Sequence, residues 1–163
     1  MVDQVLELVM IQRANFADAT QLEYCRRGYG EHVIPADAIE LVGDIPTGFI
    51  AVYREEQIVG RAVLGFEADP TFLVHSAGGS EAPWIYAVFV EPEWRGHGVG
   101  LALIEKCLEY LVQNGYQYVC LDSNTAGSWY VEKFGFTMSH SGEYEGETFD
   151  IYYRQLSGAV VPA

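Results

Sequence analysis

The sequence is short of cysteine, of positive charge and of long apolar runs, and each shortage excludes a class of protein. Its three cysteines, Cys25, Cys107 and Cys120, have no CxxC spacing, so we expect reduced, buried thiols and no metal site. Lys and Arg number 9 against 23 Asp and Glu, for a net charge of −14, which argues against binding to nucleic acid. No apolar run reaches the roughly 18 residues that span a membrane.

Signals for export and for division into domains are missing as well. The N-terminal segment MVDQVLELVMIQR carries acids before its apolar residues and lacks the basic lead of a signal peptide. Together with the reduced thiols, this predicts a cytoplasmic protein. No repeat, low-complexity stretch or Pro/Gly-rich linker divides the chain, so we expect one domain over residues 1–156 and a frayed tail over residues 157–163.

The acidic residues are spread along both halves of the sequence instead of forming a tail. Most of them are therefore expected to form a solvated surface. An excess of negative charge also favours cationic small molecules as partners, although net charge alone does not define a site.

Periodicity predicts a mixed α/β order of elements. Residues 30–47 are expected to form a loop with a short helix, and residues 67–83 a turn-rich connection. We expect helices over residues 17–29, from residue 99 to a stop at Asn114–Gly115, and over 125–133. We expect strands over residues 6–13, 48–55, 57–66, 84–90, 116–121, 135–139 and 148–155.

A glycine-lined stretch, EPEWRGHGVG, lies between the apolar strand predicted at residues 84–90 and the helix predicted from residue 99. A Walker A loop would need Lys-Ser or Lys-Thr after its last glycine, and a Rossmann turn would need glycine where Leu101 stands. What remains is R-x-x-G-x-G at Arg95, Gly98 and Gly100. Small residues at the start of a helix allow main-chain N–H groups to converge on an anion. This stretch is therefore predicted to bind an anion.

With these residues the sequence resembles the GNAT superfamily of acyl-CoA-dependent N-acetyltransferases, whose signature is V-x-P-x-x-[RQ]-G-x-G-x-[GA]. All positions match, from Val90 and Pro92 to Gly100. A second family block, Asn and then E-K-x-G-F, stands here as Asn124 and as EKFGF at residues 132–136. The resemblance covers about residues 4–156. It implies a central, twisted, mostly antiparallel sheet with a splayed pair of parallel strands, flanked by helices.

The resemblance also implies how acetyl-CoA would bind. The glycine loop and the following helix would bind the pyrophosphate, and the end of the strand before it would bind the pantetheine arm and polarise the thioester carbonyl. Asn124 would bond the pantetheine amide, or serve only as a helix cap, and Lys133 would reach the adenine end, or remain a solvated side chain. The implied cofactor-binding residues are Val88, Phe89, Val90, Arg95, Gly96, His97, Gly98, Val99, Gly100, Asn124 and Lys133.

The chain departs from the family at the catalytic acid. Family members commonly place a Tyr four residues before the Gly of G-F to protonate the departing thiolate, but Val131 stands there. Tyr130 is one residue earlier, rotated by about 100° on an ideal helix. It is the candidate acid, with packing in the core as the alternative. General acid catalysis is typically worth about 10²–10⁴, and a thiolate leaves readily, so activity could survive without it.

The base and the acceptor are less defined. Tyr86, Ala87 and Val88 occupy the strand positions where family members often carry a carboxylate. His75, Glu81 and His32 are candidate bases, and a water relay or an acceptor of low pKa would remove the need for one. The acceptor site is expected in residues 15–47, residues 67–83 with Phe72, and the last strands. The resemblance further suggests a homodimer, and no metal is expected.

Two alternatives remain at this level. A non-catalytic acyl-CoA-binding or sensor module would account for the displaced tyrosine and the absent strand carboxylate. A nucleotide-phosphate binder would use the same glycine loop with a different ligand. Binding of CoA without amine-dependent turnover would indicate the first, and preference for ATP or NAD would indicate the second.

Overall fold

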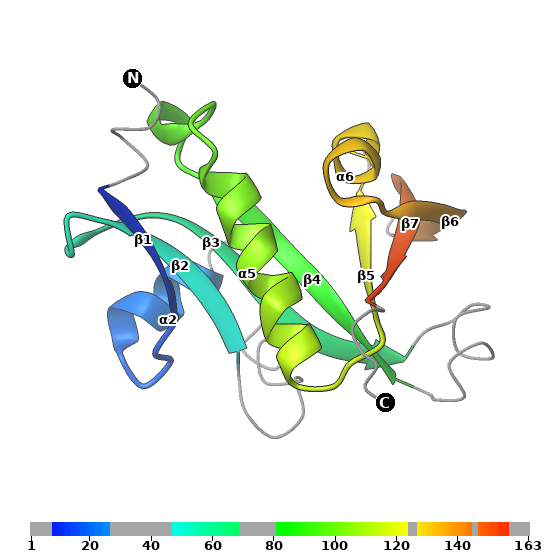
Figure 1. The fold of residues 1–163 in the computed structure, drawn as a ribbon, viewed down its shortest axis with the longest axis horizontal. Coiled ribbons are helices and arrows are strands. Elements are labelled where there is room, and N and C mark those ends of the chain that lie inside the picture. Colours follow the sequence, from blue (N-terminus) through cyan, green and yellow to red (C-terminus); the bar gives the residue numbers. More distant parts are fainter. Residues whose placement is uncertain (1–7, 27–46, 69–80, 124–126, 145–146, 157–163) are drawn as a thin grey trace.

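In the computed structural model, described over residues 8–26, 47–68, 81–123, 127–144 and 147–156, the strands form one sheet with helices on both faces (Figure 1). The seven strands lie in the order β1-β2-β3-β4-β5-β7-β6. β4 and β5 are parallel, and the other neighbouring strands are antiparallel. The expected mixed, mostly antiparallel sheet is confirmed.

The elements follow the predicted order along the chain. The strands are β1 (Val9–Arg13), β2 (Thr47–Tyr53), β3 (Gln57–Ala68), β4 (Glu81–Val90), β5 (Tyr118–Ser123), β6 (Thr137–Tyr144) and β7 (Glu147–Gln155). The helices are α2 (Ala19–Arg26), α5 (Val99–Gln113) and α6 (Gly127–Phe134), with the 3-10 turn η1 (Pro92–Trp94).

Alternation along the strands divides the core between the two faces of the sheet. In β2, Phe49 and Ala51 pack in the large cluster that includes the buried side of α5 and of α6. Their neighbours Ile50 and Val52 point to the opposite face, where Cys25 of α2 packs against them. This period of two is what a sheet covered on both faces requires.

α5 is the long helix that directly follows the glycine loop. Its buried stripe contains Ile104, Leu108 and Leu111 and is widened by Leu103 and Cys107. The predicted stop at Asn114–Gly115 is confirmed: Gly115 has a φ of 83°. The N–H of Gly115 bonds the carbonyl of Val112 at 3.1 Å, and that of Tyr116 bonds the carbonyl of Leu111 at 3.0 Å, the paired bonds of a Schellman motif.

β4 and β5 separate along their length. Their register contains one pair among the described residues, Trp84 with Cys120, and Figure 1 shows the two strands diverging from there toward α6 and the start of α5. On its other side β4 pairs with β3 as far as Val90. Between the pairs Arg61–Phe89 and Val63–Tyr86, β4 carries one extra residue, a bulge that re-aims the strand. The splay expected from the resemblance is confirmed.

The turn-rich connection predicted over residues 67–83 is wrong at both of its ends. β3 continues to Ala68 and β4 begins at Glu81, so residues 67–68 and 81–83 are strand. Pro83 stands opposite Phe66 within this ladder. The prediction weighted the local turn signal of proline, but long-range pairing with β3 overrides it.

Cys25, Cys107 and Cys120 are free and buried, as expected. Among the residues that the structure describes, no helix is long and apolar enough to span a membrane. Within the same residues, no three His, Cys, Asp or Glu side chains are grouped so that they could hold a metal ion.

Candidate active site

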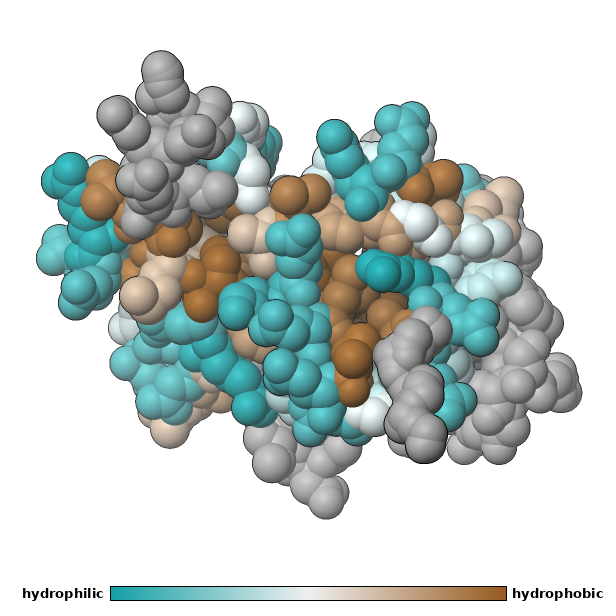
Figure 2. All heavy atoms as spheres, viewed as in Figure 1, coloured by the Kyte–Doolittle hydropathy of each residue, from teal (hydrophilic) through white to brown (hydrophobic). Residues whose placement is uncertain are grey.

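The divergence of β4 from β5 coincides with a notch in the molecular surface. Figure 2 shows this notch at the upper edge of the molecule, between the region where α5 begins and α6. Elements on the two sides come from different parts of the sequence: β4, the glycine loop and α5 on one side, β5 and α6 on the other. A ligand in the notch would therefore contact main chain on the first side and α6 on the second.

The α5 side of the notch is built from backbone. Gly98 precedes the helix with a φ of 87°, and no side chain caps the helix. The first N–H groups of α5 consequently lack the usual side-chain acceptor, since intrahelical bonding begins with Ala102 N–H to the carbonyl of Gly98 at 3.0 Å. Gly96 also has a positive φ, 83°. These two conformations explain the glycines at 96 and 98, because other residues adopt them at a cost.

Arg95 lies beside this helix start and is exposed. Its Nε donates to the carbonyl of Val90 at 2.8 Å, and its guanidinium stands 5.3 Å from the centre of the Phe89 ring. The side chain is thus anchored to the end of β4 through Nε. The geometry joins three residues that the sequence predicted for the cofactor, Phe89, Val90 and Arg95.

His97 contributes an unexpected feature to the loop. Its Nδ1 is buried and has no hydrogen-bond partner within the described part of the chain. Burying such an atom without a partner costs about 1–3 kcal/mol. The family resemblance placed this residue among those that bind the cofactor but assigned no role to its ring. An enclosed ring nitrogen and an uncapped helix start both fit a site that a polar ligand completes.

The α6 side of the notch is built from side chains. Trp129 is half-buried, and its ring edge lies 3.9 Å from the position that a Cβ on Gly100 would occupy. Val90 approaches the same position to 3.7 Å. The indole therefore reaches from α6 to the first turn of α5. Sequence reasoning missed Trp129, because the family pattern carries no signal at this position.

Tyr130, the predicted acid, is only 9% exposed and belongs to the main core cluster. Its ring packs edge-on against Trp129 at 5.0 Å and Phe136 at 6.0 Å. Val131, which stands where the family tyrosine is usual, is 43% exposed. The helix is thus rotated so that position 130 faces the core and position 131 faces solvent.

Other predicted residues contribute less. Lys133 is exposed on the last turn of α6. Asn124, His32, His75 and Phe72 lie outside the residues that the structure describes, as does the side chain of Glu81. Their predicted roles therefore stay predictions.

The opposite face of the sheet carries a second group of polar side chains that the sequence did not suggest. The hydroxyl of Tyr24 in α2 donates to Glu91, just after β4, at 2.6 Å. Arg61 is 1% exposed; it donates to the carbonyl of Tyr24 at 3.1 Å and lies 5.1 Å from the Phe89 ring centre. These contacts fasten α2 to the strand end that adjoins the glycine loop.

A family model matches this architecture. The model describes the acetyltransferase (GNAT) family and matches residues 16–136, a range that contains the glycine loop, α5 and α6. The chain belongs to the GNAT family. The resemblance inferred from the sequence motifs is thereby confirmed. No curated protein sequence matches the chain.

Solved structures of GNAT proteins share the fold. Arabidopsis thaliana NAA60 in complex with acetyl-CoA has a TM-score of 0.69 at 16% identity, over 92% of this chain and 99% of that one. The ribosomal-protein-S18-alanine N-acetyltransferase from Escherichia coli has 0.66 at 17% identity, over 93% and 96%. A Drosophila melanogaster polyamine N-acetyltransferase has 0.67 at 15% identity, over 90% and 99%. At these identities the likeness shows the fold and leaves the acceptor open.

Proposed function

We propose that this GNAT protein transfers the acetyl group of acetyl-CoA to an amine by direct attack in a ternary complex. The observation that carries the proposal is the uncapped, glycine-lined start of α5 at the open end of the β4–β5 splay. Family membership supports it, since the matched model is that of an acetyltransferase family. Cytoplasmic location and a homodimer remain predictions.

In this proposal the pyrophosphate binds the N–H groups that begin α5, assisted by the positive end of the helix dipole. Arg95 adds a positive charge beside them, and its anchoring to Val90 holds that charge near the strand end. Its contribution is local, because charges farther away than about 8 Å are largely screened at physiological salt. The negative net charge of the chain therefore does not prevent binding of an anion.

The pantetheine arm would follow β4 at Val88–Val90 on its β5 side, where the two strands have diverged. Trp129 would cover the arm from α6, since its ring already reaches Gly100 at the first turn of α5. A main-chain N–H near the bulge in β4 would stabilise the oxyanion that forms on the thioester carbonyl. The pantetheine arm would thus contact main chain on β4 and an aromatic ring on α6.

The transfer itself breaks the C–S bond of the thioester and forms a C–N bond to the acceptor. The amine must first lose one proton, and the ammonium of an alkylamine has a pKa near 10.4, so a base or a relay of water is needed. The nitrogen loses a second proton as the amide forms, and the released thiolate takes up one proton, from Tyr130 or from solvent. Tyr130 is the candidate acid in α6, but its burial in the core provides an independent reason for its presence, so we expect solvent to supply most of this proton.

The acceptor would approach from the α2 face, opposite α5 and α6. α2 is fastened there to the end of β4 through Tyr24, Glu91 and Arg61. We expect the bond between Tyr24 and Glu91 to hold the α2 face, where the acceptor would bind, next to the end of β4, where the cofactor would bind. The acceptors named for the similar structures, a polyamine and a protein alanine among them, belong to those proteins and define the panel to test.

A second candidate function is an acyl-CoA-binding module without turnover. The observation that favours it is the exposure of Val131 where an acid is usual, together with the burial of Tyr130. Such a module would bind CoA through the same glycine loop. The two candidate functions differ only in whether acetyl transfer to an amine follows the binding of acetyl-CoA.

The test is a turnover assay that measures free CoA thiol over a panel of polyamines, arylalkylamines, amino acids and peptides with free N-termini. The acetyltransferase proposal predicts thiol release that depends on at least one amine and is lost in a Gly98→Glu variant. Tight binding of CoA without amine-dependent release over the whole panel would instead establish the binding module.

A further inference from the structure

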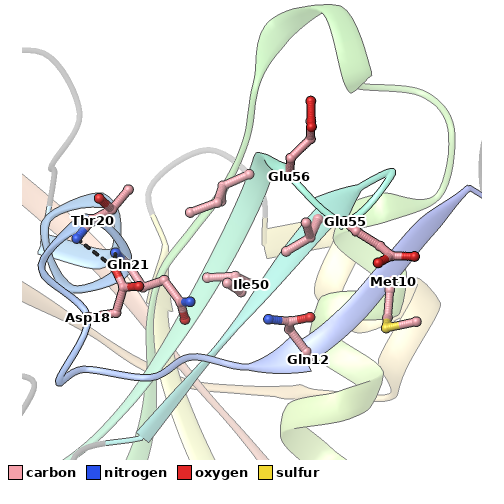
Figure 3. A pocket seen from close by; sticks show the side chains of 10 residues that line it. Met10, Gln12, Asp18, Thr20, Gln21, Ile50, Glu55 and Glu56 are labelled. Atoms are coloured by element: carbon pink, nitrogen blue, oxygen red, sulfur yellow. Dashed lines mark hydrogen bonds between the residues drawn. The ribbon is translucent and has the colours of Figure 1, made fainter.

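A hollow on the α2 face lies away from the β4–β5 splay, against β1, β2 and β3 (Figure 3). Its volume is about 560 Å³, within the range of small-molecule sites. The side chains that line it come from the three strands, the hairpin between β2 and β3, and the first residues of α2. They are Met10, Gln12, Asp18, Thr20, Gln21, Ile50, Val52, Glu55, Glu56 and Ile58.

The floor of the hollow is apolar and its rim is polar. Ile50 and Val52 are buried at 1% and 6% exposure, and Ile58 is half-buried beside them. Met10 adds a flexible apolar side chain that is 59% exposed. An apolar floor with a few convergent polar groups is the usual design of a small-molecule site.

All charged residues that line the hollow are acidic, and the carboxylates of two of them have no hydrogen-bond or ion-pair partner among the described residues. Asp18 is occupied, because its Oδ1 accepts from the N–H of Thr20 at 2.9 Å and of Gln21 at 3.2 Å. Among the described residues, the carboxylates of Glu55 and Glu56 have no hydrogen-bond or ion-pair partner. Figure 3 shows both at the hairpin end of the hollow, with Met10 beside Glu55.

The hairpin that carries these two acids has an unusual backbone. Arg54 and Glu55 both have positive φ, 51° and 67°, in a position where Asn-Gly is the usual pair. The N–H of Arg54 bonds the carbonyl of Leu8 at 3.0 Å, which holds the hairpin to the chain just before β1. This contact fixes the acids at one end of the apolar floor.

We propose that the hollow binds a small organic cation: an alkyl- or arylalkyl-ammonium whose apolar body lies on Ile50, Val52 and Ile58 and whose charge faces Glu55 and Glu56. The site is separate from the notch, since none of its lining residues belongs to β4, α5 or α6. It gives the GNAT chain a place on the α2 face to bind an amine outside the notch.

Charge also argues against a second copy of this chain as the occupant. The sequence has 23 acidic residues against 9 Lys and Arg, so a second copy would bring mostly negative charge to an acidic rim. A small cation meets no such repulsion and can be attracted by the field of the whole protein.

Methyl NMR on methionine tests the proposal without acetyl-CoA. The ¹³C-methyl signal of Met10 reports on the hollow, and that of Met138, on β6 and 49% exposed, serves as the internal control. We expect n-hexylammonium to shift Met10 to saturation without moving Met138. Hexanol should bind at least fivefold more weakly, and hexanoate should leave Met10 unmoved.

Two charge-matched double variants sharpen the test. Glu55→Gln with Glu56→Gln should weaken n-hexylammonium at least fivefold, whereas Glu105→Gln with Glu132→Gln, which removes the same charge from exposed helix positions, should not. Equal weakening by both would assign the effect to net charge and overturn the site. So would equal binding of hexanol, or a Met10 signal that moves with protein concentration alone, which would indicate a second copy. Since no acetyl transfer is measured, these outcomes are independent of the proposed enzyme activity.

Discussion

The two sides of the notch are built in different ways. The α5 side presents main chain, with positive φ angles at Gly96 and Gly98 and no side-chain cap. The α6 side presents side chains, with Trp129 directed toward Gly100 and Tyr130 turned into the core. One side follows the family signature at every position, and the other departs from it where the acid is expected. The difference suggests that cofactor binding depends on backbone geometry, whereas the chemistry depends on side chains that can be replaced.

This contrast has a physical reason. A site made of N–H groups requires residues whose side chains do not obstruct it and whose backbone adopts a left-handed conformation. Few sequences satisfy both requirements. A general acid is worth about 10²–10⁴ in rate but is not indispensable when the leaving group is a thiolate. We therefore expect substitutions on the α6 side to lower activity less than substitutions on the α5 side.

The largest effect is expected from Gly98→Glu, which should weaken binding of CoA at least 100-fold, as measured by calorimetry. The new side chain would obstruct the helix start and place a negative charge beside the pyrophosphate. Gly115→Glu is a matched control: its φ is 83°, and a Cβ there would contact nothing within 4 Å. Both variants should lose about 1–2 kcal/mol of stability through the left-handed backbone, but only the first should lose affinity. Equal affinity in both would refute the anion site.

The next effect concerns the α6 side. Trp129→Ala should weaken CoA and pantetheine about tenfold, as expected when about 50–60 Å² of apolar contact is lost. Binding of 3′,5′-ADP, which lacks the arm, should not change. Quenching of tryptophan fluorescence by CoA should also be smaller in Trp129→Phe than in the parent chain. If 3′,5′-ADP is weakened as much as pantetheine, the indole acts on the helix start instead of the arm.

The packing of α2 on the sheet can be tested through the pH dependence of stability, because Cys25 of α2 is buried there. Burial raises the pKa of the Cys25 thiol from 9.0 to about 12. This contribution to stability is complete below pH 9 and is lost as the pH rises toward 12, since the unfolded thiol ionises first. The free energy of unfolding should therefore fall by about 1 kcal/mol more between pH 9 and pH 10 in the parent chain than in Cys25→Ala. Chemical denaturation at the two pH values measures this fall. An equal fall of the unfolding free energy in the parent chain and in Cys25→Ala would show that Cys25 is not buried.

The smallest effect is expected from Tyr130→Phe. Because Tyr130 packs in the core and a thiolate leaves without assistance, kcat should fall less than threefold. The stability of the variant should change little, since the ring is kept. A fall of 100-fold or more with unchanged KM would identify the hydroxyl as the acid. Val131→Tyr complements this variant, since it restores the family tyrosine at an exposed position and should increase kcat if protonation limits the rate.

Much of the architecture could be predicted from the sequence. The glycine loop and the end of α5 at Gly115 follow from local patterns that depend on backbone conformation, whereas the splay was implied by the family resemblance; all three were predicted correctly. The extension of β3 to Ala68 and of β4 back to Glu81 was missed because it depends on pairing between distant segments. Trp129 at the notch and the Tyr24–Glu91 bond were missed for a similar reason. Contacts between residues 67 positions apart leave no periodic signal in the sequence.

The most direct test of the central claim is a thermal-shift titration with acetyl-CoA, CoA, ATP and NAD. A ligand at 100 times its Kd should add about 2.7 kcal/mol of stability, which raises the Tm of a domain of this size by roughly 5–10 °C. The account predicts this shift with acetyl-CoA and CoA, little shift with ATP or NAD, and loss of the shift in Gly98→Glu. A folded sample that responds to neither CoA species, or that prefers ATP or NAD, would contradict it.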